Sequence, residues 1–191
     1  ADLAPLKGMP LKHLNADSTQ VSDVSPLEGM KLEYLQVCRA RGKTKVSDLK
    51  PLKGMPLKTL AVNRTSVTDL TPIEGMPLTE LQIQESPISD LAPLANLPLV
   101  KLTGDFQLPR DEQLLRGIKT LTTINGKPAA DYWKEVAASL SPDRRAAEYL
   151  RSVGGKVRFD DQTEYKPAAE APQGAFRVTG ISLRDLPALT N

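Results

Sequence analysis

Several kinds of residue are scarce in this chain of 191 residues, and each scarcity narrows what it can do. The single cysteine, Cys38, excludes an internal disulfide and a cysteine-based metal cluster. Aromatic side chains make up 4% of the sequence, so the core has to be aliphatic. The formal net charge is only +2, which does not indicate the strongly basic surface of a nucleic-acid-binding protein, and we expect no nucleic-acid partner.

Long apolar runs are also missing from the sequence. A bilayer-spanning helix needs about 20 consecutive apolar residues, and no stretch approaches that length. The first residues lack the basic and apolar regions of a signal peptide. We therefore expect a soluble segment without a membrane-spanning element, and the cellular compartment is left open.

A ten-residue stretch that recurs five times organises the first half of the chain. Its clearest copy is 48–57, Asp-Leu-Lys-Pro-Leu-Lys-Gly-Met-Pro-Leu. The copies begin at aspartates 2, 23, 48, 69 and 90, which are separated by steps of 21, 25, 21 and 21 residues. Such a period is typical of a solenoid whose units pack only against their neighbours. Because the first copy has neither a preceding strand nor a polar capping unit, we expect the natural chain to continue upstream.

Each copy leads into a short alternation of apolar and polar residues. In the segment 57–62, a period of two places Leu60 and Val62 on one face and Thr59 and Ala61 on the other. This pattern predicts one short strand per repeat. Since single units bury too little apolar surface to be stable alone, neighbouring strands are expected to pair in parallel.

The return segment of each repeat has a different spacing. In 67–73, the residues Val67, Leu70 and Ile73 recur as they would on a tight helical turn. Pro72 removes a backbone donor and limits that turn to a few residues. The aspartate before each turn is expected to accept hydrogen bonds from free backbone N–H groups of the turn, a role that we favour over calcium ligation.

The sequence of apolar positions can be compared with a known repeat family. Leu-x-x-Leu-x-Val/Ile, then Thr or Ser, then Val/Ile-x-Asp-Leu-x-Pro-Leu resembles the leucine-rich repeat, particularly the short bacterial type. The resemblance covers residues 1–127. It implies an α/β repeat fold: a right-handed solenoid with a parallel sheet on its concave side and 3₁₀ turns or short helices on its convex side.

Two details of the repeats refine this resemblance. Thr19, Thr65 and Ser86 stand where many leucine-rich repeats carry asparagine, so we expect a buried ladder of hydroxyl groups. The wording Pro-Leu-x-Gly-Met-Pro-Leu is also similar to repeat regions of planctomycete multidomain proteins, among them serine/threonine protein kinases. No kinase motif is present in these residues.

The repeat pattern loosens after Leu99 and predicts a helical cap. A helix is expected over 111–119, and an amphipathic helix over 128–140 is expected to close the array, with Trp133 covering the last leucine layer. These features predict a first domain over residues 1–140.

A small α+β segment is predicted for residues 141–191. It comprises a helix over 141–153, a hairpin with strands at 156–159 and 163–165, and a further strand at 176–183. Ile181-Ser182-Leu183 looks like the first strand of a second leucine-rich array.

The sequence contains few residues that could act together in catalysis. His13 and Cys38 are the only residues of their types, and they could meet on the concave face as a nucleophile pair. No acidic partner or oxyanion feature accompanies them, so we expect no catalytic residue, cofactor or metal in this segment.

The concave strand face is the broad surface that packing leaves free. Its predicted columns share exposed, variable and mostly polar side chains: His13, Tyr34, Thr59, Glu80 and Lys101, then Asn15, Gln36, Ala61, Gln82 and Thr103, then Asp17, Cys38, Asn63, Gln84 and Asp105. Tyr34 is the best candidate for a binding anchor.

A four-residue insertion between the second and third repeats forms the other candidate surface. It gathers basic side chains, namely Arg39, Arg41, Lys43 and Lys45, which could grip a carboxylate or phosphate group or simply remain solvated. The candidate partner-binding residues are therefore His13, Tyr34, Gln36, Thr59, Glu80, Gln82, Lys101, Arg39, Arg41 and Lys43.

Two functional hypotheses follow from these surfaces. The first is a non-catalytic module that binds a protein partner, or another domain of the same chain, through the concave face and the basic loop. The alternative is a structural or regulatory repeat segment of a larger multidomain enzyme, such as a bacterial serine/threonine protein kinase.

Overall fold

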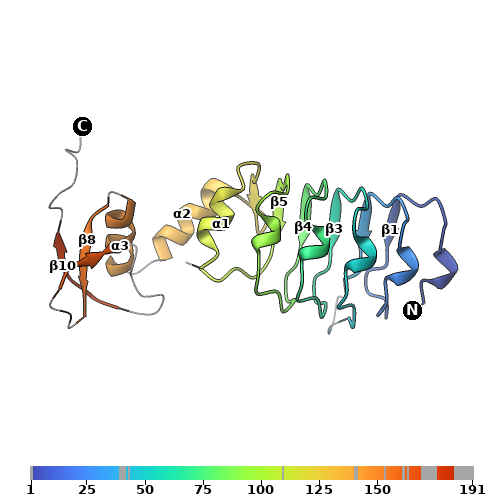
Figure 1. The fold of residues 1–191 in the computed structure, drawn as a ribbon, viewed down its shortest axis with the longest axis horizontal. Helices are drawn as coiled ribbons and strands as arrows, with labels where there is room; N and C mark the ends of the chain where they lie inside the picture. The colour runs from blue at the N-terminus through green and yellow to red at the C-terminus, as the bar shows by residue number, and fades with distance from the viewer. Residues whose placement is uncertain are drawn as a thin grey trace. The chain divides into compact units, whose positions relative to one another are not determined.

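The structure is a computed structural model that describes residues 2–38, 42, 44–108, 110–139, 142–152, 154–160, 162, 164–168 and 176–182. The chain divides into two compact units, Ala1–Tyr132 and Trp133–Asn191 (Figure 1). Helix α2 (Ala129–Ser139) crosses the boundary between them. That Trp133 caps the array stays a prediction.

The first unit is a solenoid of five similar turns, seen side by side in Figure 1. Each turn contributes one three-residue strand to a parallel sheet; these strands are β1 (His13–Asn15), β2 (Tyr34–Gln36), β3 (Thr59–Ala61), β4 (Glu80–Gln82) and β5 (Lys101–Thr103). A 3₁₀ turn precedes each strand in the chain; these turns are η1 (Ala4–Leu6), η2 (Ser25–Leu27), η3 (Lys50–Leu52), η4 (Thr71–Ile73) and η5 (Ala92–Leu94). The predicted alternation of strands and tight turns is confirmed.

The recurring aspartates serve the turns, as their position before each turn predicted. Each carboxylate accepts a hydrogen bond of 2.8 Å from the backbone N–H two residues later, at Ala4, Ser25, Lys50, Thr71 and Ala92. The proline inside each turn needs no such partner because it has no N–H. In the first four repeats a glycine then reverses the chain with a left-handed backbone, for example Gly75 at φ +72°. The recurring ten-residue stretch is therefore explained by its role in reversing the chain and packing the core.

The core of the solenoid consists of stacked aliphatic layers. Four leucines, each two residues before one of the strands β2 to β5, are all 0% exposed: Leu32, Leu57, Leu78 and Leu99. Stacking of neighbours therefore buries side chains that a single repeat would leave in water.

The methionine column shows where that stacking stops. Met30, Met55 and Met76 are 3–6% exposed, whereas Met9 in the first repeat is 42% exposed. The difference arises because the layer of Met9 has no neighbouring layer on its outer side within residues 1–191.

The hydroxyl ladder predicted from the sequence is present in part: Thr65 is 0% exposed, whereas Thr19 and Ser86 are half-buried. The Thr19 hydroxyl donates to the carbonyl of Ala16 (2.7 Å), and the Thr65 hydroxyl donates to that of Val62 (2.9 Å). The Ser86 hydroxyl lies 3.0 Å from the Thr65 hydroxyl and 2.8 Å from the Val62 carbonyl oxygen. These bonds satisfy the carbonyl groups at the bend where each strand ends.

The insertion interrupts this ladder at Thr44. Thr44 holds the position of Thr65 one repeat earlier and is only 5% exposed, but its hydroxyl has no hydrogen-bond partner among the described residues. Its backbone N–H donates to the carbonyl of Arg64 (2.8 Å), whereas the N–H of Thr65 donates to the Ser86 hydroxyl (3.1 Å). The repeat with the insertion therefore contacts its neighbour through a backbone carbonyl at this position.

The array ends in an element that the sequence interpretation missed. After α1 (Glu112–Gly117), strand β6 (Thr123–Ile124) pairs with β5 in parallel, and β7 (Lys127–Pro128) folds back antiparallel on β6. Asn125 and Gly126 have φ of 49° and 77°, as a two-residue type I′ hairpin turn requires. Pro128, predicted to begin the helix, belongs instead to β7, and α2 starts at Ala129.

The second unit packs a helix on a small antiparallel sheet. Helix α3 (Pro142–Ser152) contributes Ala147 and Leu150 to a core shared with Val157 and Phe159 of β8 (Lys156–Phe159). The sheet order is β10–β8–β9. The helix and the strand at 156–159 agree with the sequence predictions.

Two strands of this unit differ from their predicted positions. The partner of β8 in the hairpin is β9 (Lys166–Pro167), not 163–165. The connection is longer because Gln162 donates its N–H to the Phe159 carbonyl in an additional turn. Strand β10 (Val178–Ser182) pairs antiparallel with β8, and its Ile181 is 51% exposed. The second array stays a prediction, since residues 183–191 lie outside the described ones.

Candidate functional site

The strands of the first unit bring two columns of side chains to the concave face, each with one residue per strand. Strand pairing aligns the first column in register: His13 with Tyr34, Tyr34 with Thr59, Thr59 with Glu80 and Glu80 with Lys101. The second column aligns Asn15, Gln36, Ala61, Gln82 and Thr103 in the same way. Seven of the predicted partner-binding residues therefore lie together, and successive strands bring them about 4.8 Å apart.

The β1–β2 end of this face carries an aromatic pair. The rings of His13 and Tyr34 lie 6.1 Å apart between centroids at an interplanar angle of 31°. The Tyr34 hydroxyl donates to the side-chain oxygen of Gln36, which fixes the phenol along its own strand. His13 is exposed and Tyr34 is half-buried, so both rings present apolar surface to solvent.

The β3–β5 part of the face is held together by side-chain contacts. The Gln82 amide donates to Glu80 (3.2 Å), and the Asn63 amide donates to Gln82 (3.0 Å). The Lys101 ammonium lies 3.8 Å from the Glu80 carboxylate. Thr59 and Ala61 complete this part, and Ala61 is only 2% exposed, which corrects the expectation of an open second column at that position.

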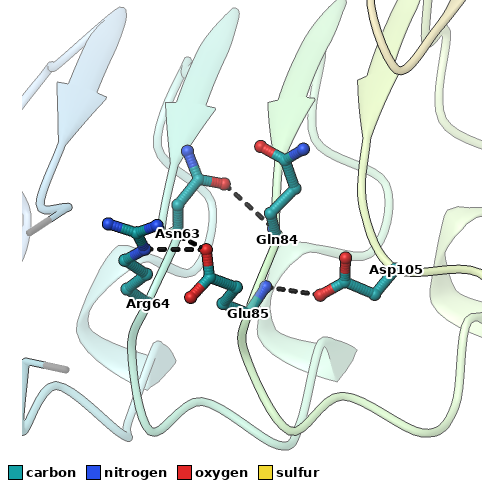
Figure 2. Close-up of polar contacts among 5 residues, drawn as sticks. All are labelled: Asn63, Arg64, Gln84, Glu85 and Asp105. Atoms are coloured by element: carbon teal, nitrogen blue, oxygen red, sulfur yellow. Dashed lines mark hydrogen bonds and ion pairs between the residues drawn. The ribbon is translucent and has the colours of Figure 1, made fainter. Parts of the chain in front are cut away.

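A second set of contacts follows the strand exits (Figure 2). The Asn63 side-chain oxygen accepts the N–H of Gln84 (2.9 Å), and Asp105 accepts the N–H of Glu85 (2.6 Å). Arg64 and Glu85 have φ of 57° and 54°, and the Arg64 guanidinium lies 2.6 Å from the Glu85 carboxylate. Polar side chains of the two flanking repeats thus satisfy the backbone of the fourth repeat at this rim.

The opposite rim holds an ionic cluster that was not among the predicted residues. The Lys58 ammonium lies 2.8 Å and the Lys12 ammonium 3.3 Å from the carboxylate of Glu33. Hydrogen bonds from Lys58 and then Lys12 hold the pKa of Glu33 below its ordinary value. All three residues immediately precede a strand, and alignment of that position across the repeats would have revealed the cluster.

The structure does not bring His13 and Cys38 together. Cys38 lies four residues beyond Tyr34, the strand partner of His13, a separation of about 13 Å along an extended strand. Cys38 is also only 6% exposed, and burial raises the pKa of its thiol. The expectation that Cys38 faces the open surface is therefore wrong, and with it the nucleophile pair that this placement would have allowed.

The basic loop cannot be placed in the same detail. Arg39, Arg41 and Lys43 lie outside the described residues, so their predicted binding role stays a prediction. Lys45, at the end of the loop, is exposed.

Two further classes of site were sought in the part of the chain that the structure describes. No group of three or more His, Cys, Asp or Glu side chains there could hold a metal ion. No described helix combines the length and apolar character that a membrane crossing needs.

Comparisons with known proteins bear on the fold. Neither a protein-family model nor a curated protein matches the chain. A solved structure of an internalin, inlF from Listeria monocytogenes, superimposes with a TM-score of 0.56 at 25% sequence identity, covering 64% of this chain and 37% of that one. The first unit is a leucine-rich-repeat array.

A second internalin structure, inlC2 from Listeria monocytogenes, matches with a TM-score of 0.45 at 34% identity over 54% of this chain and 45% of that one. The chain spans less than half the length of either internalin. The leucine-rich-repeat array is right-handed, with its parallel sheet on the concave side.

Proposed function

We propose that this leucine-rich-repeat array is a non-catalytic module that binds a protein partner through its concave face. The alignment of the variable residues carries the proposal. Five strands in register place His13, Tyr34, Thr59, Glu80 and Lys101 in one row. The strand leucines that follow the last four of them, Leu35, Leu60, Leu81 and Leu102, are buried. The packing of the repeats does not require the particular side chains of the row, so they are available to determine which partner binds.

The contacts within the face make it suitable for binding without large rearrangement. Glu80, Gln82 and Asn63 are already joined by hydrogen bonds, so a partner meets side chains whose positions are restricted beforehand. Preorganisation of this kind lowers the entropic cost of association. The partner can be a separate protein or another domain of the same chain, and we include the basic loop at 39–45 in the proposed surface.

Affinity capture with two matched variants tests this function. The full chain and a triple variant, Tyr34→Ala/Glu80→Ala/Lys101→Ala, are used to capture proteins from cells that naturally express the chain. A control variant, Lys53→Ala/Glu74→Ala, alters exposed residues next to the turns η3 and η4 instead.

We expect to capture proteins that bind the native chain and the control variant but do not bind the triple variant. Capture that is equal for the chain and both variants would contradict the proposal. The alternative, a regulatory segment of a larger enzyme such as a serine/threonine protein kinase, stays a prediction that the full-length gene sequence can test.

A further inference from the structure

We infer that the β1–β2 end of the concave face is the anchoring part of the interaction surface, and that it accepts an acidic protein segment that presents an aromatic or aliphatic side chain beside a carboxylate. This inference rests on the proposed function, because it specifies where and what the array binds. The anchoring part comprises His13 and Tyr34 together with the cluster Lys12, Glu33 and Lys58.

The two parts of the face differ in how far their polar side chains are already bonded to one another. In the β3–β5 part, Gln82 donates to Glu80 and accepts from Asn63, so part of its hydrogen-bonding capacity is used within the protein. A hydrogen bond from a partner to the remaining polar positions replaces a bond to water and contributes little net free energy. The β3–β5 part therefore favours correct placement of a partner rather than tight binding.

The β1–β2 end of the face exposes apolar ring surface. His13 and Tyr34 form a ring contact between neighbouring strands, and both rings are accessible from the concave side. The phenol is held by its bond to Gln36, so little side-chain entropy remains to be lost on binding. Interfaces draw most of their affinity from such restrained aromatic residues, which pair with apolar groups of the partner.

Two lysine side chains place positive charge beside these rings. Lys12 precedes His13 and Lys58 precedes Thr59, and their side chains remain 54% and 63% exposed although both contact Glu33. An ammonium group has three N–H donors. Glu33 is the one carboxylate that contacts either lysine among the described residues, so both lysines retain donors, and two positive charges face one negative charge.

The other carboxylates of the face that the structure describes do not pair with these lysines. Asp17 is four residues beyond His13, about 13 Å along the strand direction. The backbone of Glu80 adjoins that of Lys58, but the Glu80 carboxylate pairs with Lys101 on the far side. A carboxylate brought by the partner would therefore complete the Lys12–Glu33–Lys58 cluster while its neighbouring apolar side chain packs on Tyr34.

Selection from a library of random dodecapeptides displayed on phage, against the immobilised full chain, tests the inference. We expect the selected peptides to be net acidic and to share an aromatic or aliphatic residue next to Glu or Asp. For a synthetic peptide of this kind, Tyr34→Ala or His13→Ala should raise Kd about tenfold or more. Lys12→Ala/Lys58→Ala should raise it severalfold, and 0.5 M NaCl should weaken binding to the native chain.

Matched variants separate this inference from the proposed function. Gln82→Ala/Lys101→Ala should leave the Kd within about twofold, and a peptide with Gln in place of its Glu should bind as weakly to the native chain as the acidic peptide binds to the double lysine variant. Net basic peptides, or binding that depends on Gln82 and Lys101 but not on Tyr34 or His13, would overturn the inference and leave the proposed function standing. Peptides whose binding no concave-face variant changes would contradict both.

Discussion

The guanidinium of Arg64 lies 2.6 Å from the carboxylate of Glu85, and the two residues occupy the same place in neighbouring repeats, each with a left-handed backbone. Hydrogen bonding to Glu85 raises the pKa of Arg64 further above its ordinary range. We expect a double-mutant cycle with Arg64→Gln and Glu85→Gln to show a favourable coupling in the free energy of unfolding. Because both side chains are accessible, the coupling should decrease between 0.1 M and 1 M NaCl. Coupling that is independent of salt would contradict this expectation.

Substitution by alanine should affect stability differently at a turn glycine and at the glycine in helix α1. Gly75 has φ +72° and Gly117, in α1, does not have a left-handed backbone, yet a Cβ at either position would meet no heavy atom within 4 Å outside the local backbone. Gly75→Ala should therefore destabilise the protein by about 1–2 kcal/mol through backbone strain alone. Gly117→Ala should be neutral or stabilising by up to about 1 kcal/mol. Urea denaturation measures both, and equal effects would mean that strain is not the cause.

The carboxylate of Asp69 should contribute to the loss of stability in acid. Hydrogen bonds from the Thr71 backbone N–H and then its hydroxyl lower the pKa of Asp69. A lowered pKa in the folded state means that this contribution is fully present above the unfolded pKa of about 3.9 and is lost as the pH falls through the folded value. Asp69→Asn retains a capping side chain but cannot titrate, so its urea midpoint should decrease less between pH 7 and pH 3 than that of the native chain. An identical decrease would argue against the role of Asp69.

Shortening a single leucine side chain of the core should destabilise the array. Leu60 is 0% exposed between the second and fourth repeats, and Leu60→Ala should lower the free energy of unfolding by about 2–5 kcal/mol. Thr59→Ala, next to it on the concave side, is the matched control and should cost less than about 1 kcal/mol. Chemical denaturation followed by circular dichroism measures both values, and a similar cost for the two would mean that the register of the strand is wrong.

The methionines provide a chemical test of the packing. Met9 is 42% exposed, while Met30, Met55 and Met76 are 6%, 3% and 3% exposed. Under mild hydrogen peroxide, Met9 should form its sulfoxide well before the other three, as peptide mapping by mass spectrometry would show. All four should react at similar rates in urea, which serves as the control. Equal rates in the native protein would contradict the described layers.

Local patterns made much of the array predictable. The alternation of Thr59 and Leu60 sets strand and face, and the aspartate before each turn has a nearby backbone donor in every repeat. The hydroxyl ladder could be predicted because Thr65 and Ser86 are one period apart. Each of these features depends on spacing within the sequence, which the repeat makes visible.

Features that depend on neighbouring strands were harder to predict. Cys38 is only 6% exposed, although its column position indicated exposure, because burial at the end of a strand depends on the neighbouring repeat as well. The Lys12–Glu33–Lys58 cluster requires the register of three strands, together with side-chain conformations that no single repeat specifies. The hairpin at Asn125–Gly126 is different, since that dipeptide is a strong turn signal that the predicted helix at 128–140 obscured.

The short strand β7 gives the sheet two unlike edges. Ala129 directs its N–H toward Thr122, so the backbone nitrogen of the preceding Pro128 points away from the sheet, where a proline has no hydrogen to offer. A strand from another molecule that approached this edge would find a donor missing, which discourages the edge-to-edge association that leads to aggregation. The β1 edge has no proline within His13–Asn15. The two edges therefore differ in their ability to pair with a further strand: the β1 edge offers backbone donors without a proline, whereas Pro128 leaves the β7 edge with a donor missing.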